Sequence, residues 1–238
     1  VAVRAQLEQL FVGWQAGTPY ASIDTRYTDV AAKQQRFETP DKPNAVLLAR
    51  QNLSLRVTDA DYPAMIVANR IFGGGALKSR LGDRIRQQEG LSYGVSSGIR
   101  ADDSRGGQDD AGSFTVQAIA APENMAKVEA LVREELDKLL KDGVTADELK
   151  DAVAGTLTER QQARAEDGTI AGMLTDQLYF GRTMQFTTEL DAKYAALTRE
   201  QVNAAIRKHL KPEALSVFVA GDFAKAASTS AAAPGATP

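Results

Sequence analysis

The chain has 238 residues, 43% of them hydrophobic, enough to bury a large core as one large domain or two small ones. Its formal net charge of -3 and its scattered basic residues give no indication of nucleic-acid binding. No run of 18 apolar residues occurs, which excludes a membrane-spanning helix, whereas the start at Val1 leaves an upstream leader and secretion open. Because cysteine is absent, disulfides, thiolate nucleophiles and cysteine metal sites are excluded.

The N-terminal region predicts a short helix followed, after a linker, by an extended segment. Residues 1–12 place Leu7, Leu10 and Phe11 on one side of a helix, and a turn rich in Gly, Thr and Pro follows. Apolar residues then alternate with polar ones from 44 to 57. This alternation predicts one long half-buried strand, or two strands joined by a bulge.

Two helices are expected next, separated by three glycines. The first should begin with N-capping oxygens in 58–61 and Pro63 in its first turn, and end near Phe72. The second should end at Gly90. Its apolar stripe recurs every four residues, at Leu77, Leu81 and Ile85.

A hairpin is predicted after Gly90. Side chains alternate along 93–99 and again along 114–120, which is typical of two strands. The loop between them, 101–111, is rich in Asp, but its spacing does not match a calcium-binding EF-hand loop. A solvated loop is therefore the preferred interpretation.

The remaining elements are mostly helices. A strong amphipathic helix is expected from Pro122 to Gly143, and Thr-x-x-Glu and Thr-x-x-Gln capping boxes at Thr145 and Thr198 predict two more helix starts. Residues 215–219 predict a closing strand, and the tail has no periodicity. Because helices cluster instead of alternating with strands, we predict an α+β fold with a largely antiparallel sheet and helices packed on it.

The single histidine, His209, restricts the chemistry that this chain can perform. Both helical zinc-peptidase motifs need two histidines, so neither can form here. A Ser-His-Asp triad would have to use His209, which lies in the basic last turn of a predicted helix. A cation there complements the helix dipole, so a structural role is favoured.

The most informative stretch runs from the glycines Gly73, Gly74 and Gly75 to Tyr93. The glycines lack the Gly-Lys-Ser/Thr ending of a phosphate loop, so a substrate-facing loop and a plain interhelical turn both stay open. Arg86 ends a helix and Tyr93 begins the next strand, so a guanidinium and a phenol could converge across the turn. The alternative is a helix-terminal cation beside an amphipathic strand residue.

Together these pieces resemble the C-terminal domain of the insulinase or pitrilysin family of zinc peptidases, which includes mitochondrial processing peptidase. The resemblance divides the chain into a helix and linker (1–35), the peptidase-like domain (36–223) and a disordered tail (224–238). The matching segments are Gly73-Gly74-Gly75, Ser79-Arg80-Leu81, Arg86-x-x-x-Gly90-Leu91-x-Tyr93, Leu178-Tyr179-Phe180-Gly181, Leu197-Thr198-x-x-Gln201-Val202 and Leu215 to Asp222.

The resemblance implies one homologous half of a clamshell-type metallopeptidase, with zinc in the other half and none bound by this chain. Arg86 and Tyr93 match the pair that holds substrate backbone and the transition state, and no catalytic residue is expected on this chain alone. The implied partners are a zinc-bearing homologous half or subunit and a peptide substrate, and a dimer is left open. A second function is a non-proteolytic structural or binding subunit of the same fold. The cysteine-free chain and its Ala/Pro tail favour a bacterial envelope protein slightly over a cytoplasmic one.

Overall fold

The structure is a computed structural model that describes residues 2–19, 21, 23–75, 78–105 and 108–231. Its centre is a five-stranded sheet with the strand order β1-β5-β2-β4-β3. The pairing of β1 with β5 is parallel, and the other pairings in this sheet are antiparallel. The predicted α+β fold with a largely antiparallel sheet is therefore confirmed. The strands span Gln34–Glu38 (β1), Ala45–Ser54 (β2), Ser92–Arg100 (β3), Ala111–Ala120 (β4) and Ser216–Gly221 (β5).

One face of the sheet is buried and the other is open. Along β2, Leu47 and its alternate neighbours are buried, whereas Val46 and Leu48 are exposed. This period of two matches the predicted half-buried strand. The register places Val46 opposite Ile119 of β4 and Ala220 of β5, and Phe37 of β1 is also opposite Ala220, so these residues share the exposed side. We call this side the open face; an apolar row crosses it.

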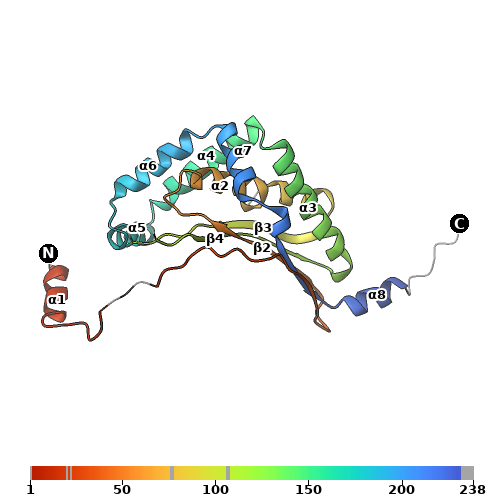
Figure 1. Cartoon of the computed structure of the whole chain (residues 1–238), viewed down its shortest axis with the longest axis horizontal. Coiled ribbons are helices and arrows are strands. Elements are labelled where there is room, and N and C mark those ends of the chain that lie inside the picture. The colour runs from red at the N-terminus through yellow and green to blue at the C-terminus, as the bar shows by residue number, and fades with distance from the viewer. Residues whose placement is uncertain (1, 20, 22, 76–77, 106–107, 232–238) are drawn as a thin grey trace.

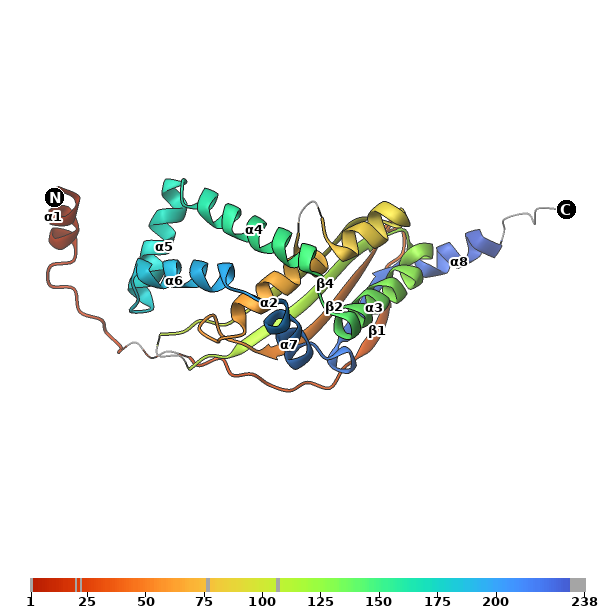
Figure 2. The ribbon, with the colours of Figure 1, turned by 90° about the horizontal axis from the view of Figure 1, so that it is seen from above.

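The helical layer covers the opposite face. Figure 1 shows α2, α3, α4, α6 and α7 on one side of the sheet, and Figure 2 shows α4 running outward, α5 connecting at its far end and α6 returning beside it. The bounds are Tyr62–Asn69 (α2), Met125–Asp142 (α3), Ala146–Ala163 (α4), Asp167–Tyr179 (α5), Met184–Ala195 (α6) and Arg199–His209 (α7). Short 3-10 turns span Pro122–Asn124 (η3) and Pro212–Ala214 (η4).

The core lies between this layer and the sheet. Leu47 of β2 and Phe114 of β4 face it, and the ring of Phe114 packs on that of Phe72, with 5.9 Å between centroids. The apolar stripe that predicted the third long helix is buried in α3 as expected. Both predicted capping boxes are present, at the starts of α4 and α7.

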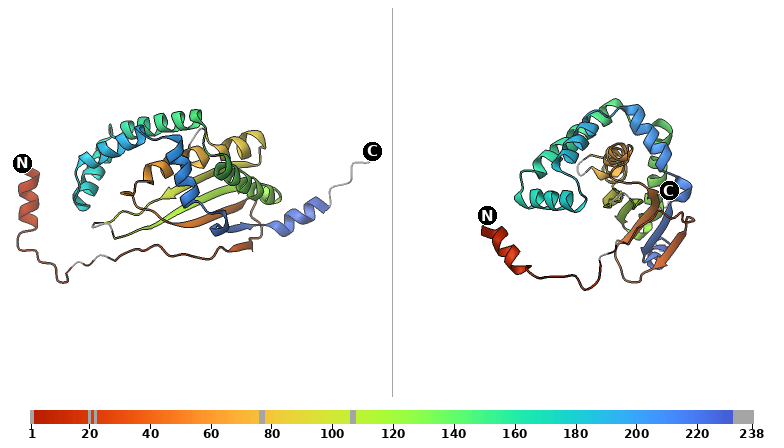
Figure 3. Two further views of the ribbon diagram at one scale, coloured as in Figure 1. Left: turned by 45° about the horizontal axis from the view of Figure 1, so that its top comes forward. Right: turned by 60° about the vertical axis from the view of Figure 1, so that its left-hand side comes forward.

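Helices at the two ends of the chain stand away from the sheet. Figure 3 shows α1 (Ala2–Leu10) and α8 (Phe223–Ala231) projecting from the body. The apolar side chains of α1 and the residues after it, including Leu10, Phe11 and Trp14, are exposed. The start of the segment expected to be an unstructured tail is helical in α8, and residues 232–238 lie outside the described residues. No helix in the described part of the chain is long and apolar enough to cross a membrane.

The acidic loop before β4 holds the N-terminal strap, which we define as residues 24–33. The main-chain N–H of Thr25 donates to Asp109 Oδ1 at 2.7 Å, and the Thr25 hydroxyl donates to Asp102 Oδ2 at 2.6 Å. Asp110 accepts from the N–H of Tyr27 at 2.7 Å, and this hydrogen bond lowers the pKa of Asp110. The expectation of a merely solvated loop is therefore wrong: its carboxylates fasten a segment about 80 residues earlier in the chain.

Candidate functional site

Two π-helical segments lie on the stretch that leads to Tyr93, and the first of them contains Gly73 and Gly74. They are η1 (Arg70–Gly74) and η2 (Gly82–Gln88). In each, an N–H donates five residues back: Gly75 to Arg70 O at 3.0 Å, and Glu89 to Arg84 O at 3.3 Å. Such wide turns are rare and occur frequently at functional sites. The sequence predicted ordinary α-helices here, and the glycines do not stop the first one at Phe72, because η1 continues through Gly74.

The three glycines allow the chain to pass very close to its neighbours. A Cβ on Gly73 would lie 2.6 Å from Ser97 Oγ and 2.8 Å from the Ser97 nitrogen on β3. A Cβ on Gly74 would lie 2.4 Å from the Asn69 side chain. A Cβ on Gly75 would lie 2.3 Å from a main-chain oxygen. Packing therefore gives these positions a structural reason to be glycine.

Arg86 and Tyr93 lie on consecutive elements joined by the turn at Gly90. Arg86 is exposed on η2, and Tyr93 is 98% exposed near the start of β3. Gly90 has a φ of 62°, a left-handed conformation that glycine adopts without strain. Among the described residues, no hydrogen bond, ion pair or ring contact involves either side chain, so the structure leaves both polar tips free without joining them.

A bulge at the start of β3 sets the direction of Tyr93. The register shifts between Ser92 and Gly94, so Tyr93 is the extra residue. The Ser92 hydroxyl is buried and contacts the main-chain oxygens of Ile119 at 2.7 Å and Gly94 at 2.9 Å. A regular alternation from 93 to 99 would place Tyr93 on the buried side of the strand with Val95 and Ile99. Because of the bulge, Tyr93 is exposed instead.

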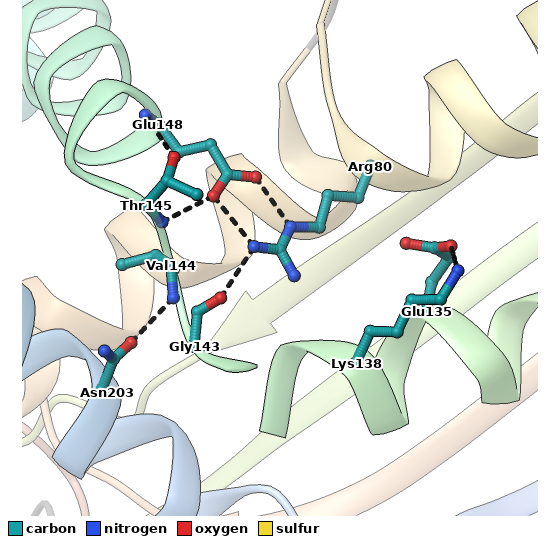
Figure 4. Close-up of polar contacts among 8 residues, drawn as sticks. All are labelled: Arg80, Glu135, Lys138, Gly143, Val144, Thr145, Glu148 and Asn203. Atoms are coloured by element: carbon teal, nitrogen blue, oxygen red, sulfur yellow. Dashed lines mark hydrogen bonds and ion pairs between the residues drawn. The ribbon is translucent and has the colours of Figure 1, made fainter. Parts of the chain in front are cut away.

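Ion pairs fasten this segment to α4. The pairs are Arg70 with Glu159, Lys78 with Asp151, and Arg80 with Glu148. Figure 4 shows the third of these, where the Arg80 guanidinium donates to both Glu148 oxygens, at 2.7 and 2.8 Å, and to Gly143 O at 2.7 Å. Glu148 also accepts from the N–H of Thr145 in the capping box. One carboxylate thus both caps the start of α4 and holds Arg80, two residues before η2.

Electrostatics at this anchor favour the charged pair. The hydrogen bond to Glu148 raises the pKa of Arg80. Burial raises the pKa of Glu148, but hydrogen bonds from Arg80 and Thr145 outweigh it, and the pKa is lowered overall. Arg80 lies in one sequence motif and Glu148 in a capping box, but the bond between them requires the tertiary fold.

The described residues offer no zinc site. They contain no group of three His, Cys, Asp or Glu side chains placed to hold a metal ion. His209 is mostly buried, and its Nε2 lies 3.0 Å from Asp61 Oδ2, which also accepts from Lys208 at 2.6 Å. Residues 58–61 were expected to supply N-capping oxygens for α2, but the N-cap residue, Asp61, makes no side-chain capping bond and contacts α7 instead.

Comparisons with known proteins agree with the resemblance. The family model for the peptidase M16 inactive domain matches residues 1–156. A zinc protease of Streptomyces coelicolor is 31% identical over 151 residues, which cover 63% of this chain and 31% of that protein. The non-peptidase homologue YmxG of Helicobacter pylori is 23% identical over 205 residues, covering 82% of this chain and 46% of the relative.

A solved structure shows the same fold. The peptidase M16 inactive domain of Pseudomonas fluorescens matches with a TM-score of 0.77 and 26% identity, over 92% of this chain and 50% of that chain. The chain thus spans a half or less of the length of these relatives. It belongs to the peptidase M16 family, the insulinase or pitrilysin zinc proteases, as an inactive C-terminal domain.

Proposed function

We propose that this domain is the substrate-holding half of a zinc metalloendopeptidase. The observation that carries the proposal is the pair Arg86 and Tyr93, two exposed donors without partners on either side of the Gly90 turn. Nearby arginines such as Arg80 and Arg84 are already bound to carboxylates. A free guanidinium and a free phenol can donate to a peptide carbonyl and to the oxyanion that develops as the bond is cleaved.

The zinc is proposed to come from a homologous half or partner subunit. The relatives extend well beyond the length of this chain, and the described residues lack a metal site. Two exposed apolar surfaces are available to bind a partner: the side chains around α1, and the row of Phe37, Val46 and Ile119 on the open face. Burying such surface against a protein of similar fold is favourable.

The substrate is proposed to bind as an extended strand on the edge of β3. That strand pairs only with β4 within the described sheet, so its other edge is open to strand addition. The Asn69 side chain hydrogen-bonds to this strand at Ser97, and Gly73 packs against the same residue. The substrate is proposed to pair with the part of the edge next to Tyr93, away from these contacts.

A second candidate function is a non-proteolytic binding or structural subunit. A specific observation favours it: the relative YmxG is a non-peptidase homologue that matches more of this chain than the zinc protease does. The apolar surfaces on α1 and on the open face would serve such an assembly equally well. A scaffold has no chemical need for unpartnered Arg86 and Tyr93, which is why the peptidase role is preferred.

The test is zinc-dependent cleavage of a quenched peptide by this chain with the zinc-bearing half, and by each alone. Only the mixture should be active, and loss of one oxyanion donor should lower kcat by about 100-fold for Arg86→Ala and about tenfold for Tyr93→Phe. Arg199→Ala and Tyr27→Phe, which change exposed residues elsewhere, serve as matched controls and should retain wild-type kcat. Stable association without any cleavage would favour the scaffold function.

A further inference from the structure

The turn between η2 and β3 is held by one carboxylate, that of Glu89. One of its oxygens accepts from Arg84 on η2, and the other accepts from Lys127 Nζ on α3 at 2.6 Å. The two cations outweigh the cost of partial burial, and their hydrogen bonds, from Lys127 foremost, lower the pKa of Glu89. Among the described residues, this is the side-chain bond that ties the turn to the long helix α3.

Two main-chain hydrogen bonds close this turn, and one of them is long. The N–H of Glu89 reaches Arg84 O over 3.3 Å, and the N–H of Leu91 reaches Ile85 O, six residues back, at 3.0 Å. Gly90, which follows Glu89, is a glycine and therefore has the freest backbone of any residue type. A wide helical end followed by glycine therefore needs an additional tie to fix the direction of the chain that follows.

Arg86 precedes Glu89 by three residues, and Tyr93 follows it by four. Because these two side chains make no bonds of their own, their relative placement depends on the backbone between them. We infer that Glu89, bound by Arg84 and Lys127, is a positioning residue that sets the geometry of Arg86 and Tyr93. The inference rests on the proposed function and adds to it a residue that does not touch the substrate.

The first test measures hydrogen–deuterium exchange in the whole chain. Glu89→Gln and Lys127→Met should each make the amides of residues 88–93 exchange about tenfold faster, since local opening loses one of its restraints. Glu134→Gln is the matched control, because Glu134 lies on the same helix α3 and pairs with Lys138 at 2.6 Å. It should leave residues 88–93 unchanged. Unchanged exchange in Glu89→Gln would overturn the inference.

The second test separates positioning from general stability. With the zinc-bearing half present, Glu89→Gln should lower kcat about fivefold to tenfold with little change in KM, as expected for a misplaced transition-state donor. In a chain that already carries Arg86→Ala and Tyr93→Phe, the same change should have no further effect. An equal loss in both backgrounds would contradict positioning through this pair. If Arg86→Ala and Tyr93→Phe themselves leave kcat unchanged, the proposed function fails, while the exchange experiment still decides whether Glu89 holds the turn.

Discussion

Replacing Gly73 with alanine is expected to lower the free energy of unfolding by about 1–3 kcal/mol, which is typical of overpacking. The new Cβ would meet Ser97 on one side and Leu81 Cδ1, at 2.9 Å, on the other. A side chain can rotate away, but the Ser97 nitrogen belongs to β3 and is fixed by the sheet. Either η1 or the strand must therefore shift.

The measurement is urea unfolding of the purified chain, followed by circular dichroism. Gly172→Ala is the matched control: it lies inside α5, and its added Cβ would have no atom of another element within 4 Å. This variant should gain about 0.5–1 kcal/mol from the better helix propensity of alanine. A Gly73→Ala variant as stable as wild type would show that the glycine loop can leave β3, and the substrate-facing interpretation of Gly73, Gly74 and Gly75 would then be favoured over packing.

Features set by neighbouring residues could be predicted from the sequence. The apolar spacing of α3, the capping boxes at Thr145 and Thr198 and the alternation along β2 each act within a few residues, and each is found where the pattern places it. The α+β arrangement followed from the clustering of helices. Local physical chemistry was sufficient for the main framework.

Features set by distant residues could not be predicted in this way. All five residues of β1 are exposed, so no apolar pattern marks the strand, which forms by pairing with β5 about 180 residues later. The π-helical turns of η1 and η2 depend on how the glycine segment packs on β3 and α4. Arg86 and Tyr93 were identified by resemblance, whereas Glu89 became a candidate only when the fold brought Lys127 beside it.

The second large effect is expected at Arg80. Replacing it with methionine keeps much of the side-chain volume but leaves Glu148, whose side chain is 25% exposed, without its cation, and Gly143 O without a donor. Removing one partner of a buried ion pair costs about 3–5 kcal/mol, and partial exposure here reduces the expected loss to about 2–3 kcal/mol. Lys78→Met is the matched control, because its pair with Asp151 is largely exposed and should contribute little.

Acid should remove most of the difference between Arg80→Met and wild type. The folded-state pKa of Glu148 lies below its ordinary value of 4.5, so the contribution of the pair is complete above about pH 4.5 and is lost as the pH falls through the folded pKa. Without Arg80, burial has no opposing cation and the depressed pKa should rise. Urea unfolding at pH 7 and near pH 3 checks this. An equal loss at both values would mean that Arg80 stabilises the protein through its hydrogen bond to Gly143 and its packing, not through the charge of Glu148. Since this anchor adjoins η2, a weakened anchor should also loosen the segment that carries Arg86.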